Sequence, residues 1–413
     1  MNNNQNQPGE FDVVLGGENP APVTGIVLGG IEGVKRRLES EIVDVRIKAL
    51  NDALNYGDEG LDLVIEALEE DSLQVKGFAS RLLKESGGEK GKQALLEFDP
   101  YLYFTKLDDW EVEEFNPEVG IVNPKNQAYV VNLEKLQILI QDDRVNEVEA
   151  LICYLHYYDY ESGYTASENY NDFFKIILDN CVDLENLKAL FVGDKEINRF
   201  RESYVEIGNL SLLLKAYQNL EVLHIRGCCE QLEFEIVKHN NLKTLIIETV
   251  FGNYNAFERI CSSNLPALEY FELWMGQYYI PRHKNIIDTF KPILFSESFP
   301  NLYYLGIRSS ENADEIAEGI ARFCNTAELP ITDNLLILDL SMGNLTEEGL
   351  GFLLQSSAIS NLHTLDISNN CVSEEFLEQV EQLSPPNYWL ITNFQEEIIE
   401  RGIGVSRYLA LHE

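Results

Sequence analysis

The sequence predicts two consecutive solenoids, an α-helical one followed by a longer α/β one. Two observations predict this fold class. In the first quarter of the chain, apolar residues recur at three- and four-residue steps, and the pattern repeats after 30 residues. From about residue 148 onward, one template of three apolar positions recurs eight times. We therefore expect N-terminal helical repeats, followed by a horseshoe with a parallel sheet and outer helices.

The strand template is clearest in the segment NLHTLDISNN, residues 361–370. Leu365 and Ile367 alternate on a short strand and point into a core, and Leu362 packs just before that strand. Asn370 follows at the position where an amide side chain bonds the backbone of the next turn. This spacing is the L-x-x-L-x-L-x-x-N signature of a leucine-rich repeat. One such unit cannot bury its apolar face alone, so it requires neighbouring copies.

Seven further copies precede this one, and six of the eight begin with an Asn-Leu pair. Their apolar positions are Val148, Leu151 and Cys153; Leu187, Leu190 and Val192; Leu220, Leu223 and Ile225; Leu242, Leu245 and Ile247; Leu268, Phe271 and Leu273; Leu302, Leu305 and Ile307; and Leu335, Leu338 and Leu340. The spacing between most copies leaves room for a helix, as in residues 345–360, where Thr346 is the expected N-cap. The segment LDLSMGNLTEEGLGFLL resembles the ribonuclease-inhibitor type of horseshoe. The region from residue 132 onward resembles intracellular bacterial leucine-rich-repeat proteins.

Two helical segments near the N-terminus superpose at an offset of 30 residues. Val45 then matches Val75, Ala49 matches Ala79, and Gly57 matches Gly87. Residues 29–98 are therefore predicted to be two-helix repeats. They resemble HEAT-type repeats of the short bacterial kind found in phycobilin lyases and related cyanobacterial proteins. That resemblance implies a helical solenoid, a fold that serves scaffolds, lyases and regulators alike.

The remaining segments complete the expected domain organisation. Residues 1–28 form a Gly/Pro-rich lead-in without the Gly-Lys-Ser/Thr sequence that a phosphate loop requires. Residues 99–131 are expected to be a connector with an edge strand at 128–131. The repeat domain then spans residues 132–384 and opens with a helix. Residues 385–413 are expected to cap the open strand edge.

The net charge restricts the class of partner. Thirty-one basic and 69 acidic residues give a formal net charge of −38 at pH 7. Nucleic acids and anionic membranes are therefore poor candidate ligands, and a protein partner with basic groups is favoured over them. Solubility is the other explanation for the charge. The sequence indicates no oligomeric state.

The sequence also suggests where the chain resides. No apolar run reaches the roughly 18 to 20 residues of a membrane span. The N-terminal residues show no secretory signal. We expect a cytoplasmic protein.

No residue pattern indicates catalysis, a metal or a cofactor. Seven cysteines form an odd set without a C-x-x-C pair, which predicts reduced and mostly buried thiols. None of the six histidines lies in a catalytic motif. His224 and His363 are expected at equivalent outward strand positions, several repeats apart. The sequence therefore predicts a non-enzyme.

Residues two, four and six places after the first Leu of each copy are expected to face outward, onto the concave side of the sheet. Among them, the candidate partner-binding residues are Phe191, His224, Arg226, Glu248, Tyr270, Glu272, Trp274, Tyr304, Arg308, Asp339 and Asp366. Aromatic and arginine side chains dominate interface hot spots, and Trp274 is expected to be exposed. The alternative is that the aromatic residues reflect strand propensity alone.

Three functions are therefore open. The first is a non-enzymatic interaction or scaffold module that binds a protein partner on the concave face. The alternative is a chromophore lyase or chaperone resembling phycobilin lyases and acting through the HEAT-like part, which fold analogy alone suggests. The third is a sensor of foreign protein, although the sequence carries no recognisable effector domain.

Overall fold

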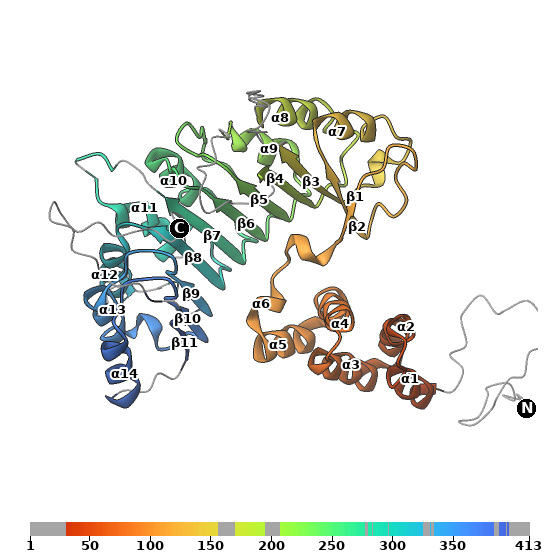
Figure 1. Cartoon of the computed structure of the whole chain (residues 1–413), viewed down its shortest axis with the longest axis horizontal. Coiled ribbons are helices and arrows are strands. Elements are labelled where there is room, and N and C mark those ends of the chain that lie inside the picture. Colours follow the sequence, from red (N-terminus) through yellow and green to blue (C-terminus); the bar gives the residue numbers. More distant parts are fainter. Residues whose placement is uncertain are drawn as a thin grey trace, which may run out of the picture. The chain divides into compact units, whose positions relative to one another are not determined.

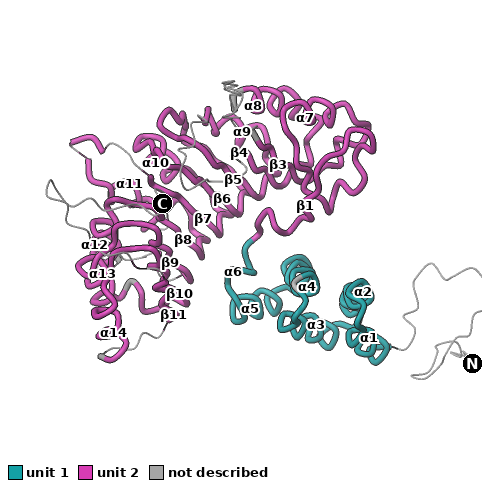
Figure 2. Tube along the Cα trace, viewed as in Figure 1, with its two compact units in different colours: residues 1–104 teal, residues 105–413 magenta. Residues whose placement is uncertain are grey.

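The chain forms two compact units in a computed structural model, one ending at Phe104 and the other beginning at Thr105 (Figure 2). The structure describes residues 30–155, 170–194, 207–276, 280–282, 284–295, 297–324, 331, 334–383, 388–393 and 395. The expected lead-in and most of the expected C-terminal cap lie outside these residues.

Unit 1 is helical throughout its described part. Its α-helices are α1 (Gly30–Leu38), α2 (Val43–Ala53), α3 (Gly57–Glu66), α4 (Leu73–Ser86), α5 (Gly88–Phe98) and α6 (Pro100–Tyr103). From α1 to α6 each helix packs on the next, and α2 also contacts α4 while α3 contacts α5. Leu50, Val64, Val75 and Leu83 belong to the core that these contacts bury. Stacked helices of this kind agree with the 30-residue offset in the sequence.

Unit 2 is built on one parallel sheet of eleven strands, which follow one another in sequence order (Figure 1). The strands are β1 (Glu111–Glu114), β2 (Gln127–Val131), β3 (Ala150–Leu155), β4 (Ala189–Asp194), β5 (Val222–Arg226), β6 (Thr244–Glu248), β7 (Tyr270–Gly276), β8 (Tyr304–Ser310), β9 (Ile337–Asp339), β10 (Thr364–Asp366) and β11 (Trp389–Ile391). The helices are α7 (Leu133–Leu139), α8 (Tyr170–Asp179), α9 (Leu210–Ala216), α10 (Tyr254–Cys261), α11 (Ile286–Leu294), α12 (Ala313–Cys324), α13 (Glu347–Leu354) and α14 (Glu374–Leu383). Because each strand pairs only with its sequence neighbours, the unit is an α/β solenoid, as predicted.

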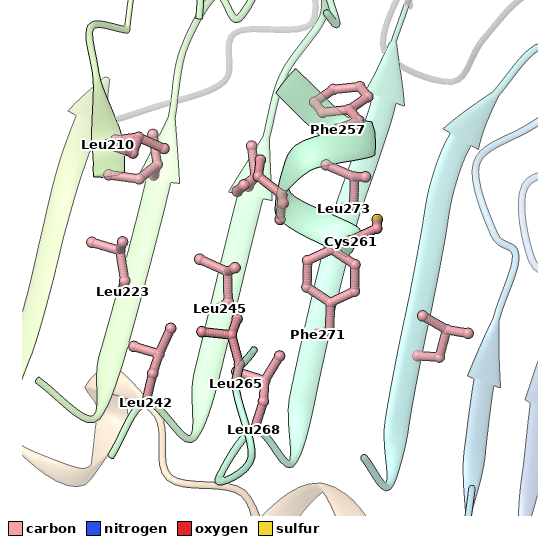
Figure 3. Close-up of a cluster of buried hydrophobic side chains, with 14 of the residues drawn as sticks. Leu210, Leu223, Leu242, Leu245, Phe257, Cys261, Leu265, Leu268, Phe271 and Leu273 are labelled. Carbon is pink, nitrogen blue, oxygen red and sulfur yellow. The ribbon is translucent and has the colours of Figure 1, made fainter. Parts of the chain in front are cut away.

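The predicted strand phasing is confirmed by the register of the sheet. Leu223 pairs with Leu245, which pairs with Phe271, and all three lie in the main core. Figure 3 shows these side chains between the sheet and helix α10, together with the fully buried Leu273. The eight predicted copies therefore become the adjacent strands β3 to β10. Thr346 also caps α13 as expected, because its side chain accepts a hydrogen bond from Glu348 N.

The asparagine of the Asn-Leu pairs links successive repeats. In five copies its Nδ2 donates to the backbone carbonyl just before the strand of the preceding repeat. The bonds are Asn186 to Asn146, Asn219 to Glu185, Asn241 to Gln218, Asn301 to Pro266 and Asn334 to Pro300. The amide thus satisfies carbonyl groups at one edge of the solenoid, which explains its recurrence in the sequence.

Strand β11 is a further repeat that the sequence pattern did not predict. Asn370 Nδ2 donates to Leu340 O and its Oδ1 accepts from Leu345 N. One repeat later, Gln395 makes the corresponding bonds, because its Nε2 donates to Ile367 O and its Oε1 accepts from Val372 N. A glutamine therefore replaces the asparagine of the signature in the last unit.

Strands β1 and β2 lie within the segment that the sequence analysis assigned to a connector, residues 99–131. Both are part of the sheet, so the described boundary between the units falls earlier, between Phe104 and Thr105. All four residues of β1 are exposed, and three are glutamates. A strand without a buried face has no apolar alternation, so only its pairing with β2 identifies it.

Candidate interaction surface

The candidate surface is the face of the sheet opposite the core, which we call the inner face. Its side chains alternate with the core residues along each strand. Leu223 and Ile225 of β5 lie in the core, so Val222, His224 and Arg226 face the other way. The predicted site residues all occupy such positions, and the sheet register places them side by side.

The first part of the inner face is apolar and is covered by residues 105–110. Ala189 and Phe191 belong to a buried cluster on β2 to β5, and Leu107 and Trp110 pack against it. Nearer the middle of the sheet, Thr244 Oγ1 donates to Thr105 O at 2.5 Å. The chain therefore crosses the inner face before it enters β1, and this covering segment hides part of the predicted surface.

A second cluster joins β4, β5 and β6 around Glu248. Its two carboxylate oxygens contact Arg226 Nε at 2.5 Å and His224 Nε2 at 2.8 Å. The Phe191 ring lies edge-on to His224 and beneath the Arg226 guanidinium, with centroid distances of 4.7 and 5.3 Å. Burial alone would raise the pKa of Glu248, but the bonds and charges of His224 and Arg226 lower it to about 2.

A third cluster is centred on the buried carboxylate of Glu272. It accepts hydrogen bonds from Tyr270 Oη at 2.5 Å, Trp274 Nε1 at 2.6 Å and Arg308 Nη1 at 2.8 Å. The Arg308 guanidinium also lies over the Trp274 ring, 5.1 Å from its centroid. Burial raises the pKa of Glu272, yet the Arg308 charge and these donors outweigh it, so the pKa lies below its usual range.

The same cluster extends to Tyr304 and Asp339. Tyr304 stacks on Tyr270 at 3.9 Å and donates to Asp339 Oδ2 at 2.7 Å. Arg308 Nε lies 3.4 Å from Asp339, so one guanidinium serves two carboxylates. Burial and the nearby Asp366 raise the pKa of Asp339 above its usual value, although Arg308 opposes them.

The structure brings the predicted aromatic and arginine residues together, but the expectation that Trp274 is exposed was wrong. Trp274 is 8% exposed, Tyr270 3% and Tyr304 1%. Neighbouring strands lie only about 4.8 Å apart, so large inner-face side chains fill the space between one another. Their polar atoms bond to Glu272 and Asp339, the two carboxylates that contact Arg308.

Trp389 on β11 is an exposed aromatic residue that the sequence analysis missed. It is 69% exposed and pairs in register with Thr364 of β10. Its neighbour Leu390 packs against the core, which places Trp389 on the inner face. The alternation in WLI was the available signal, but it lies in residues 385–413, for which a cap is expected from the sequence.

The two histidines predicted at equivalent positions are not equivalent. His224 lies in the middle of β5, whereas His363 immediately precedes β10. When the register is followed from strand to strand, the position of His224 corresponds to Glu272 on β7, Asp339 on β9 and Asp366 on β10. His363 lies three residues before Asp366, so the two histidines occupy different positions of the repeat and their predicted equivalence was wrong.

Six cysteines of the described part are free and five of these are buried, namely Cys153, Cys228, Cys229, Cys261 and Cys371. Burial raises the pKa of the Cys229 thiol to about 12 and also raises the pKa values of Cys153 and Cys261. These thiols are packed as small apolar groups, as predicted.

Two features are absent from the described residues. In that part of the chain, no three His, Cys, Asp or Glu side chains are grouped to hold a metal ion. Among the same residues, no helix has the length and apolar character needed to cross a membrane.

Comparison with known proteins adds evidence on the fold. No family model matches the sequence, and no curated protein does. A solved Bacteroides fragilis protein is similar, with a TM-score of 0.54 and 22% identity over 78% of this chain and 85% of that chain. A Listeria monocytogenes internalin (TM-score 0.32, 11% identity, 85% of this chain and 95% of that one) also matches.

A leucine-rich-repeat protein from Leptospira interrogans matches as well, with a TM-score of 0.26 and 13% identity over 68% of this chain and 75% of that one. At these identities, likeness concerns the fold alone. The repeat geometry described above is that of an α/β solenoid in which strands β3 to β10 carry the leucine-rich pattern of the sequence.

Proposed function

We propose that this chain is a non-enzymatic protein-binding module that holds its partner on the inner, concave face of the leucine-rich-repeat domain. One observation carries the proposal. The inner face is a continuous parallel sheet whose arginines are fixed by buried carboxylates before any partner arrives. Binding to side chains that are already ordered costs less conformational entropy than binding to mobile ones.

The proposed contact residues are the side chains around Glu248 and Glu272 that remain partly exposed. His224, Arg226 and Arg308 show 16%, 22% and 23% of their side chains to solvent. Tyr270, Trp274 and Tyr304 contribute little surface of their own, but they bond to the carboxylates that position Arg308. Phe191, Glu248, Glu272 and Asp339 belong to the same supporting layer.

The partner offers a carboxylate to Arg226 or Arg308, and it carries basic groups that face the acidic surroundings, in keeping with the net charge of −38. Long-range attraction of this kind accelerates encounter more than it slows dissociation. Higher salt concentration should therefore lower the association rate constant chiefly. The free thiols of the described part fit the reducing conditions of the cytoplasm, where we place the protein.

Unit 1 is proposed to be a HEAT-like scaffold that carries the binding domain. Its helices contact their neighbours and next-but-one neighbours, an arrangement that supports stacked two-helix repeats. The lyase-like alternative depends on resemblance alone. Incubating the protein with a bilin and an acceptor protein should therefore give no coloured adduct.

Site-specific photo-crosslinking tests the proposal. A photoreactive phenylalanine analogue would replace one of three aromatic residues: the partly buried Tyr154 on the inner face, Phe352 on helix α13, or Phe98 in unit 1. Phe352 and Phe98 are each 38% exposed, which makes them suitable controls. Partner recovered by affinity purification should crosslink from position 154 alone. Crosslinking from position 352 or 98 without any from 154 would contradict inner-face binding.

A further inference from the structure

The C-terminal end of the inner face carries unbalanced negative charge. On β7 to β10, the inner-face carboxylates are Glu272, Asp339 and Asp366, and Arg308 is the cation that contacts the first two. No cation among the described residues lies within ion-pair distance of Asp366. Its Oδ1 accepts bonds from Ser368 N and Oγ at 2.9 and 2.7 Å. These bonds fix the carboxylate, and none from the described part of the chain reaches its Oδ2.

Trp389 lies beside this carboxylate on the next strand. Thr364 pairs with Trp389 and Asp366 with Ile391, so Asp366 and Trp389 are diagonal neighbours on one face. Diagonal neighbours in a sheet are about 7–8 Å apart. The His363 ring approaches the Trp389 ring at 5.5 Å, and most of the tryptophan remains exposed. An apolar ring with high exposure therefore adjoins a carboxylate that lacks a counter-charge.

We propose that a cationic side chain of the protein partner, preferably an arginine, binds between the Trp389 ring and Asp366. This inference rests on the proposed function and specifies the chemistry of one contact on the inner face. A cation within about 6 Å of a tryptophan ring is attracted to its face. At the spacing of a diagonal pair, one guanidinium can stack on the ring while an N–H donates to Asp366 Oδ2.

The same three chemical groups meet three strands away, although there the tryptophan and the carboxylate lie on one strand. Arg308 lies over the Trp274 ring at 5.1 Å and donates to Glu272 at 2.8 Å, so tryptophan, guanidinium and carboxylate form one group. Trp389 and Asp366 reproduce the tryptophan and the carboxylate on adjacent strands. No described residue supplies a guanidinium between them, and in our proposal the partner provides it.

The test uses the full-length protein and a blocked Gly-Arg-Gly peptide, with a Gly-citrulline-Gly peptide as the uncharged control. The readout is the indole N–H resonance of Trp389 in NMR titrations at about 150 mM salt, a concentration that screens distant charges. Substitution of Trp389 by Phe assigns that resonance. The resonances of Trp110 and Trp274 report whether each variant keeps its fold.

The arginine peptide should shift the Trp389 resonance saturably, whereas the citrulline peptide should not. Asp366→Asn should weaken arginine binding at least about fivefold, because it removes the charge-assisted hydrogen bond. Glu375→Gln, which removes an exposed charge on α14, should leave the affinity unchanged. Equal shifts with both peptides, or unchanged affinity in Asp366→Asn, would overturn the proposal.

Further outcomes distinguish failure of the proposed cation site from failure of the proposed inner-face binding. If deleting residues 396–413 strengthens arginine binding at Trp389 severalfold, the chain's own C-terminal segment occupies the site and the proposal fails. If crosslinking places the partner on the inner face but the arginine peptide does not bind, only the cation site is wrong. Failure of the crosslinking test would instead remove the proposed function on which this site depends.

Discussion

At the scale of single residues, fixed donors favour the charged form of two buried carboxylates of the inner face, Glu248 and Glu272. Glu248 shows this most clearly, because its pKa falls to about 2 although burial opposes ionisation. A carboxyl whose pKa is lower in the folded than in the unfolded state stabilises the fold above the unfolded pKa. That stabilisation is lost as the pH falls towards the folded value.

The first prediction follows from this linkage. Between about pH 5 and pH 2, protonation of Glu248 should remove about 3 kcal/mol of unfolding free energy, at about 1.4 kcal/mol per pKa unit. Glu248→Gln should lack this part of the pH dependence, whereas the exposed control Glu375→Gln should retain it. Urea unfolding of both variants across this range measures the difference. Parallel pH profiles for Glu248→Gln and the wild type would contradict the assignment.

The second prediction contrasts two strand positions, one buried in the core and one exposed on the inner face. Leu273→Ala should cost about 2–5 kcal/mol of unfolding free energy, because it leaves a cavity in the main core. Trp389→Ala should change stability by less than about 1 kcal/mol, because its side chain is 69% exposed. Denaturant unfolding followed by far-UV circular dichroism measures both. Equal costs would show that the strand phasing around β11 is incorrect.

Residue patterns predicted the side of the sheet on which a side chain lies, but not how much of it remains exposed. Period-two alternation places Trp274 and Trp389 on the same face. Whether such a side chain is buried depends on its neighbours on adjacent strands, since Arg308 of β8 covers Trp274 whereas β11 has a described partner strand on one side only. Those neighbours are distant in sequence, so a local pattern contains no information about them.

At the scale of elements, the side-chain amide bonds of Asn370 and Gln395 mark the last two repeats of the described part. The eight predicted strands were recognisable because each carries the full apolar template. β11 was not, because Asn387 and Thr392 occupy positions where other repeats have Leu or Ile. Only the bonds of Gln395, made at the place of Asn370, identify it as a repeat.

The third prediction tests this terminal unit. Gln395→Ala removes the acceptor of the Val372 amide and the donor to Ile367 O. We expect the Val372 amide to exchange with solvent at least about tenfold faster, since a lost buried hydrogen bond costs roughly 1–3 kcal/mol. Hydrogen exchange measured by NMR detects the change. The Leu345 amide, bonded to Asn370, serves as the control and should be unaffected.

At the scale of the whole molecule, two separate apolar cores predict two independently folding units. The core of unit 1 includes Leu50 and Val64, and the main core of unit 2 includes Leu223 and Leu273. A solenoid is stabilised by contacts between neighbouring repeats, so each unit contains its own stabilising contacts. Fragments divided at the described boundary should therefore fold and keep their separate functions.

The last prediction concerns where that division must be made. A fragment of residues 105–413 retains Leu107 and Trp110, which cover the apolar cluster of Ile152 and Phe191 on the inner face. A fragment of residues 111–413 lacks this cover and exposes the cluster to water, at a cost of about 25 cal/mol for each Å² of apolar surface.

We therefore expect the longer fragment to unfold at a urea concentration close to that of unit 2 in the intact chain, and the shorter one at a clearly lower concentration. The longer fragment should also bind the partner with the affinity of the full chain, while residues 1–104 alone should not bind it. Partner binding by residues 1–104 would instead place recognition on the helical repeats, with the horseshoe serving as their support.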